Sequence, residues 1–314
     1  PLPVGVMVGT TYNLGDATDV YFDGGNFTWI DAYASYVYNG AYKMEGDPDN
    51  NRVILTAGAT STLTSDGSVD KFGHGVSYIN TGQFVVGTDS AGKLFNFRQR
   101  GPLWTYDEST IPDRLPTAKF GTSVGVDVDT AVVGAPEYDG RGAAFIFVKD
   151  PGAETWSLED RIEADGSATG DDFGSAVAIS QSRVIIGAPE ANSGKGAAYV
   201  FERVGATWHN RSLPVPAGLS GNADFGAAVD IYKQNLVVGA PGINKVYIYN
   251  RNTGVWVQAD VLNGSGEYGR SVGLDETTLV VGAPATGGNI GAASVYAYDG
   301  LNWISQAALA ASGG

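Results

Sequence analysis

One segment of about fifty residues recurs along the chain and constrains its fold more than any other feature. Its clearest copy, FGSAVAISQSRVIIGAPEANSGKGAAYVF, covers residues 173–201. Apolar and small residues alternate at period two, and Gly and Pro bound the runs, which is typical of β-strands. Pro189 has no amide hydrogen and belongs at a strand end. The segment therefore predicts three antiparallel strands, and a fourth follows near Trp208.

Six copies of this segment follow one another in the same order. They start at residues 14, 72, 120, 173, 225 and 268, which are 43 to 58 residues apart. Four-stranded repeats of about 40 to 50 residues are typical of propeller blades. The sequence thus predicts an all-β fold, a single β-propeller over residues 1–314 with six blades, and seven as the alternative. The expected blades are residues 14–71, 72–119, 120–172, 173–224, 225–267 and 268–314, with residues 1–13 as a closing strand.

The repeat carries a family resemblance. Phe-Gly followed about fourteen residues later by Gly-Ala-Pro resembles the FG-GAP repeat, the unit of the β-propeller in integrin α chains and in many bacterial and algal surface proteins. The copies at 120, 173, 225 and 268 match well, whereas those at 14 and 72 have drifted. The resemblance implies the propeller fold, and it implies function more loosely.

Charge and composition exclude several classes of partner. The chain has 34 acidic and 19 basic residues, a net charge of −15. Nucleic acids and anionic membranes are bound through basic patches, so neither is expected as a partner. We find no apolar run of about 18 residues, so membrane insertion is not expected either. The absence of cysteine excludes disulfides and thiolate metal sites.

A catalytic site is not visible in the sequence. The pattern Gly-x-Ser-x-Gly occurs at residues 121–125 and 269–273, and the histidines are His74 and His209. A nucleophile elbow needs a strand-turn-helix setting and a nearby histidine base. Both copies instead begin a repeat, so we interpret them as repeat consensus. We predict no catalytic residues and keep a carbohydrate-active enzyme as the weaker alternative.

Calcium is a possible cofactor that the sequence supports poorly. The resemblance implies calcium in the hairpin between strands one and two, but the hairpins here lack the required acidic spacing. A second oxygen-rich set, Asp165, Asp171 and Asp172, precedes a Phe-Gly pair. These carboxylates either satisfy backbone amides at the turn or bind a divalent cation.

The loops between strands two and three are the candidate ligand-binding surface. In the family that the chain resembles, ligands meet the face built by these loops and by the connections from strand four to the next blade. Here the loops vary in length and charge while their flanks stay constant, as expected of a binding surface on a rigid scaffold. The candidate residues are Tyr138, Asp139, Arg141, Glu190, Asn192, Lys195, Asn244 and Asn289.

These observations favour a non-catalytic extracellular or cell-surface module that binds a protein or a glycan. The alternative is a structural subunit of an extracellular filament or coat, with copies of itself or other subunits as partners. Potential N-glycosylation sites agree with an extracellular location; they are Asn26, Asn210 and Asn263.

Overall fold

The fold is described by a computed structural model. It describes the strands between Thr11 and Thr110 and residues 118–150, 156–211 and 213–310. Ahead of Ala118, side chains are described at residues 75–78, 85–87 and 94–96. The predicted closing strand over residues 1–13 falls mainly outside these ranges. Within them, no helix is long and apolar enough to cross a membrane.

Four regular blades make up the chain from Phe120 onward. Each is an antiparallel sheet of four strands in sequence order. The second blade has β12 (Ser123–Asp127), β13 (Thr130–Ala135), β14 (Ala143–Lys149) and β15 (Trp156–Ile162); the third has β16 (Ala176–Ser180), β17 (Arg183–Ala188), β18 (Ala197–Val204) and β19 (Thr207–Arg211). The fourth has β20 (Ala228–Tyr232), β21 (Asn235–Ala240), β22 (Lys245–Asn252) and β23 (Val255–Asn263); the last has β24 (Ser271–Leu274), β25 (Thr278–Ala283), β26 (Ala292–Tyr298) and β27 (Trp303–Ala310).

Short helical turns join the second and third strands of these blades. They are η1 (Tyr138–Gly140), α1 (Ala191–Gly194), η2 (Pro241–Ile243) and α2 (Thr286–Asn289). Each turn follows the Gly-Ala-Pro motif, so the proline sits at a strand end, as the sequence predicts.

The first blade is larger than the others. Its strands β8 (Phe72–Ile79), β9 (Gln83–Thr88), β10 (Lys93–Arg100) and β11 (Leu103–Thr110) are extended beyond β11 by β6 (Arg52–Thr56) and β5 (Met44–Asp47). The remaining strands form a separate five-stranded sheet; they are β1 (Thr11–Asn13), β2 (Thr18–Asp23), β3 (Asn26–Asp31), β4 (Tyr36–Gly40) and β7 (Thr62–Ser65).

The blade count is therefore five, and the sequence-based count of six is wrong. Residues 14–71 were expected to form a blade, but their strands divide between the five-stranded sheet and the edge of the first blade. The physical reason is visible in the sequence. This segment opens with Leu14-Gly15, and its second-strand run at residues 27–30 is followed by Asp31. No glycine therefore stands at the position where Gly87 and Gly134 contact the backbone of the next blade.

The blades contact one another through the two motifs of the repeat. Phe120, Phe173 and Phe225 are buried at blade boundaries. The glycine of each of the first three Gly-Ala-Pro motifs lies against the backbone of the next Phe-Gly or Tyr-Gly pair. A Cβ atom would lie 1.9 Å from the Gly174 oxygen if built on Gly134, 1.9 Å from the Gly226 oxygen on Gly187, and 2.0 Å from the Gly269 oxygen on Gly239. No other residue fits at these positions without moving the backbone.

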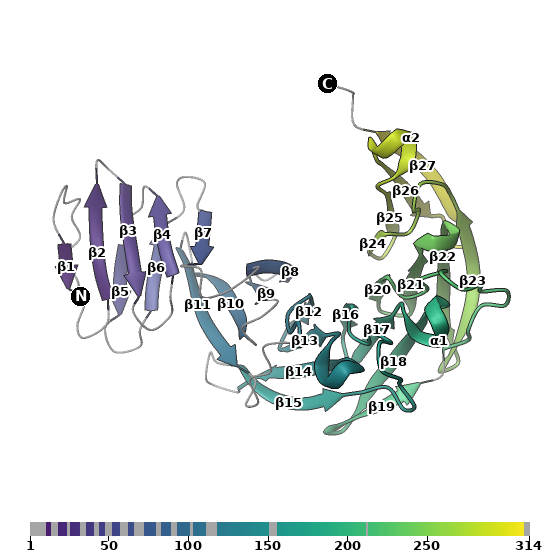
Figure 1. Cartoon of the computed structure of the whole chain (residues 1–314), viewed down its shortest axis with the longest axis horizontal. Helices are drawn as coiled ribbons and strands as arrows, with labels where there is room; N and C mark the ends of the chain where they lie inside the picture. Colours follow the sequence, from purple (N-terminus) through teal and green to yellow (C-terminus); the bar gives the residue numbers. More distant parts are fainter. Residues whose placement is uncertain are drawn as a thin grey trace.

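The inner strands β8, β12, β16, β20 and β24 lie next to one another along an arc, as Figure 1 shows. Side chains link neighbours at this inner edge. Ser180 Oγ accepts a hydrogen bond from Lys233 N at 3.1 Å, and Asp230 Oδ2 accepts one from Leu274 N at 2.6 Å. The repeated segment thus sets both the blade and its attachment to the next blade.

Candidate functional site

The predicted loop surface lies at one end of the strands. In the second blade Ser123 pairs with Gly134, and in the third Ala176 pairs with Gly187. The second strand therefore ends where the inner strand begins. The Phe-Gly turns and the loops at residues 136–142, 189–196, 241–244 and 284–291 consequently share this end, which we call the loop face.

Backbone hydrogen bonds hold these loops against the following blade. Gly170 N donates to Gly140 O at 2.7 Å, and Phe173 N donates to Arg141 O at 3.2 Å. The same contact recurs one blade later, where Phe225 N donates to Lys195 O at 3.2 Å. The loops of the second and third blades are thus fixed, because each is fastened to the following blade as well as to its own.

Five of the candidate binding residues are exposed on the loop face. They are Asp139, Arg141, Glu190, Asn192 and Lys195. Asp139 and Asn192 have positive φ angles of 49° and 56°, which turn the chain sharply within the loop. Carboxylates, an amide and two cations therefore stand side by side along adjacent loops.

Tyr138 differs from its neighbours because its ring lies in the core. Only 9% of the residue is exposed, and its ring meets Phe145 edge to face at 5.3 Å. Its hydroxyl accepts a hydrogen bond from Arg161 Nη1 at 2.6 Å, and the Arg161 guanidinium lies 5.1 Å from the ring centroid. Burying the ring stabilises the loop from below, and a ligand contact through Tyr138 stays a prediction.

The structure describes the side chain of one of the two remaining candidate residues, Asn244 and Asn289. The Asn244 side chain is half-buried, and its Oδ1 accepts a hydrogen bond from Tyr268 N at 3.2 Å. Asn244 therefore positions the next Phe-Gly-like turn. The side chain of Asn289 lies outside the described residues.

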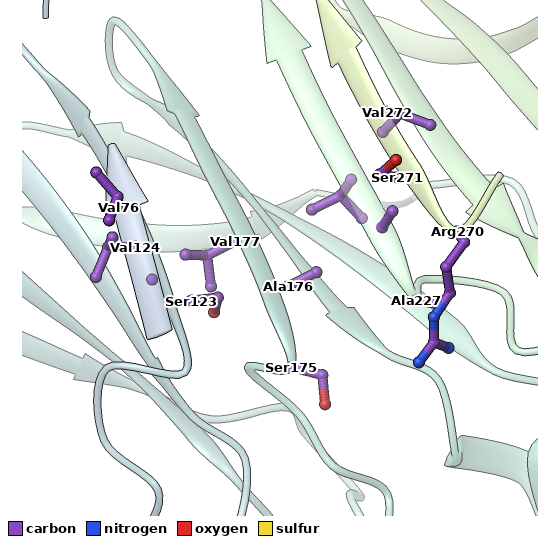
Figure 2. Close-up of a pocket in the computed structure, with 13 residues that line it drawn as sticks. Val76, Ser123, Val124, Ser175, Ala176, Val177, Ala227, Arg270, Ser271 and Val272 are labelled. Carbon is purple, nitrogen blue, oxygen red and sulfur yellow. The ribbon is translucent and has the colours of Figure 1, made fainter. Parts of the chain in front are cut away.

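A cavity of about 290 Å³ opens at the centre of the inner strands (Figure 2). Residues of all five inner strands line it, and most of them are small. Among the described residues that line it, Arg270 is the one with a charged side chain. It takes the position that is Thr122, Ser175 and Ala227 in the three preceding blades. Sequence reasoning missed this residue, although an arginine in a small-residue position was the available signal.

Two serines that line the cavity donate hydrogen bonds to backbone oxygens of the fold. Ser123 Oγ donates to Gly174 O at 2.8 Å across a blade boundary, and Ser175 Oγ donates to Asp172 O at 2.8 Å. Ser123 belongs to a Gly-x-Ser-x-Gly pattern, but β12 leads through a short turn into β13. The pattern is therefore part of an inner strand and lacks the setting of a nucleophile elbow.

The predicted metal carboxylates lie in turns. Asp171 Oδ2 accepts a hydrogen bond from Ala168 N at 2.7 Å, and Asp165 is exposed. Burial and the Glu190 carboxylate raise the pKa of Asp172, while Lys119 opposes them. In the described part of the chain, no three His, Cys, Asp or Glu side chains gather into a metal-binding group. A divalent cation at these residues stays a prediction.

The potential glycosylation sites are only partly described. Asn210 and Asn263 are exposed on the outer strands of their blades. The side chain of Asn26 lies outside the described residues. Glycosylation stays a prediction.

Comparison with known proteins agrees with the repeat structure. The FG-GAP repeat model matches residues 110–147 and 156–201. Mouse (Mus musculus) integrin alpha-3 is 32% identical over 160 residues, which is 44% of this chain and 15% of the integrin. Integrin alpha-6 of Gallus gallus is 29% identical over 228 residues, which is 62% of this chain and 21% of the integrin. The chain thus carries FG-GAP repeats, is similar to integrin alpha chains, and matches a minor part of their length.

A solved structure supports the fold. The crystal structure of a functionally unknown protein from Desulfotomaculum acetoxidans DSM 771 has a TM-score of 0.56 to this chain at 12% sequence identity. The match covers 84% of this chain and 78% of that one. At this identity it shows the shared architecture alone.

Proposed function

We propose that the protein is a non-catalytic, extracellular binding or adhesion module that meets a protein ligand through its loop face. The observation that carries this proposal is the fixed row of exposed charged loops beside the Arg270 cavity. Loops of opposite charge on a rigid scaffold are suited to recognition, because their side chains are ordered before the ligand arrives.

The chemistry of the loop face favours a protein over a metal or a nucleic acid as ligand. Arg141, Lys195 and Arg270 supply positive charges on a chain whose net charge is −15. Asp139 and Glu190 stand beside them. A ligand surface with both signs of charge would pair with this pattern, and such pairing mainly sets specificity and association rate. The similarity to integrin alpha chains supports the same class of function.

The test compares two variants that remove equal charge at opposite ends of the strands. The loop-face variant is Arg141→Ala with Lys195→Ala. The control is Lys149→Ala with Lys233→Ala, whose residues lie beside the hairpins between strands one and two. Both variants and the wild type are passed over immobilised extracellular-matrix proteins and glycans in surface plasmon resonance.

We expect the wild type to bind at least one protein, and the loop-face variant to bind it about tenfold more weakly, since two contacts at an interface together contribute about 1.4 kcal/mol. The control should stay within about twofold of the wild type. Equal loss in both variants would contradict a loop-face site. Binding to glycans and to no protein would contradict a protein ligand and indicate a glycan instead.

A further inference from the structure

Two neighbouring blade boundaries differ in how their charges are matched. Between the second and third blades, one arginine meets one glutamate. Arg203 Nη2 pairs with one oxygen of the Glu159 carboxylate, and Trp208 Nε1 donates to the other oxygen at 3.2 Å. This pair of charges is balanced, and the indole N–H has an acceptor.

The boundary between the third and fourth blades holds three arginines around one glutamate. Arg183 Nε donates to Glu202 Oε1 at 3.2 Å, and Arg211 Nε donates to Glu202 Oε2 at 3.1 Å. Arg251, from the fourth blade, donates through Nη2 to both oxygens at 3.0 and 3.1 Å. We call Arg183, Arg211 and Arg251 the arginine cluster. Glu202 is the one acidic partner that these arginines have among the described residues, so two positive charges are in excess.

The excess charge is partly buried and can be reached from one side. The exposed fraction is 11% for the Arg183 side chain, 18% for Arg251 and 40% for Arg211. Like charges that are partly removed from water destabilise one another unless an anion compensates them. Arg211 is the member of the cluster through which such an anion would enter from solvent.

The arginine cluster also has unused hydrogen-bond donors. Both terminal nitrogens of Arg211, and Nε and Nη1 of Arg251, have no partner among the described residues. A guanidinium group carries five N–H donors in a planar fork, which binds oxyanions through paired hydrogen bonds. The cluster can therefore hold a second anion beside the Glu202 carboxylate.

A buried indole without a partner lies beside the arginine cluster. Trp256 pairs with Arg251 across the β22–β23 hairpin. Its residue is 1% exposed and shares a core cluster with Val200, which is the strand partner of Arg211. Its Nε1 has no hydrogen-bond partner in the described structure. A buried N–H of this kind destabilises the fold unless an acceptor reaches it.

The preceding boundary shows what is missing here. Glu159 and Arg211 each lie three residues after the tryptophan of their own blade. Glu159 supplies the acceptor for Trp208 Nε1 of the next blade. At the equivalent place before Trp256, the chain supplies a guanidinium in place of a carboxylate. An anion held by Arg211 would restore the acceptor.

We propose that the arginine cluster and Trp256 Nε1 bind a tetrahedral oxyanion, a sulfate or phosphate group, between the third and fourth blades. A dianion would bring the net charge of the cluster with Glu202 to zero. A free ion and an ester group on a larger ligand offer the same chemistry. Arg183 directly follows the hairpin between strands one and two, at the strand end opposite the loop face. The inference is therefore independent of the ligand that the loop face binds.

The experiment titrates the full chain with sodium sulfate, while sodium chloride keeps the ionic strength constant. Calorimetry measures the affinity, and tryptophan fluorescence reports on Trp256. We expect saturable binding with a dissociation constant of about 1 mM or below. Arg211→Gln should weaken sulfate binding at least about tenfold, because it removes the guanidinium with the most free donors. Trp256→Phe should remove most of the fluorescence change.

Lys149→Gln is the matched control. Lys149 pairs with Trp156 in the second blade as Arg251 pairs with Trp256, so the substitution removes one positive charge at an equivalent place outside the site. It should bind sulfate within about twofold of the wild type. Circular dichroism melting must show that every variant is folded.

Three results would overturn the proposal. They are a wild type that gives neither heat nor a fluorescence change up to about 20 mM sulfate, an Arg211→Gln variant that binds sulfate as the wild type does, and an equal loss in Arg211→Gln and Lys149→Gln. A parallel titration with glucose 6-sulfate distinguishes the sources. Binding of both compounds supports an ester group as the ligand, and binding of inorganic sulfate alone supports a free ion.

Discussion

Asp230 shows how a single residue connects two blades. The carboxylate lies at the inner edge of the fourth blade, where it accepts hydrogen bonds from Leu274 N at 2.6 Å and from Ile231 N at 2.8 Å. Burial raises the pKa of Asp230 to about 6, against the opposing effect of these two hydrogen bonds. Because this pKa lies above the unfolded value of 3.8, folding takes up a proton between the two values.

The consequence is a stability that falls as pH rises from about 4 to about 6. We predict that Asp230→Asn removes this dependence, which is worth up to about 3 kcal/mol for two pKa units in a buried group. Urea unfolding of both proteins at several pH values measures it.

Glu202 titrates in the opposite sense, because the hydrogen bond from Arg211 and the charges of Arg251 and Arg183 outweigh burial and lower its pKa. That contribution is common to both proteins, so their difference isolates Asp230. Parallel pH profiles would contradict the assignment.

Sequence reasoning placed the loops correctly but could not resolve individual side chains within them. Asp139 and Tyr138 are adjacent, yet one is exposed and the other is buried beneath the loop. A positive φ at Asp139 reverses the chain at this point, and no local pattern marks it. Arg270 was passed over for a related reason, because its place in the central cavity depends on five strands that are far apart in sequence.

At the scale of elements, the glycines of the repeat explain why the blades keep their spacing. From sequence alone, the Gly-Ala-Pro motif is interpreted as structural. The structure shows which backbone atoms its glycine contacts. Gly187 lies against Gly226 of the next blade, whereas Gly282 faces no following blade in the described chain.

We predict that Gly187→Ala destabilises the protein far more than Gly282→Ala does. A methyl on Gly187 would lie 1.9 Å from a backbone oxygen and force two blades apart, at a cost of about 2 kcal/mol or more. At Gly282 the nearest atom is the Ser271 hydroxyl at 2.2 Å, which can rotate away. Chemical denaturation at low protein concentration compares the two. Equal losses of unfolding free energy would show that the blade boundary is not the constraint.

The strand order of the four regular blades was predictable because each carries both motifs. Residues 14–71 were not predictable in the same way. Alternating apolar residues specified strands there, but without a Gly-Ala-Pro glycine nothing in the segment specifies which sheet those strands join. Strand formation is a local property, whereas blade identity depends on contact with a neighbour.

At the scale of the whole molecule, the blades follow one another along an arc (Figure 1). In the described chain, each of the three middle blades is held by a neighbouring blade on both sides.

Hydrogen exchange followed by mass spectrometry tests that claim most directly. In dilute, monomeric protein, we predict slow exchange for β13, β17 and β21, each of which has neighbours on both faces. We predict exchange at least about tenfold faster for β25, which has no following blade in the described chain, since a loss of about 1.4 kcal/mol in local stability gives that factor. Equal protection of all four strands in the monomer would contradict the account.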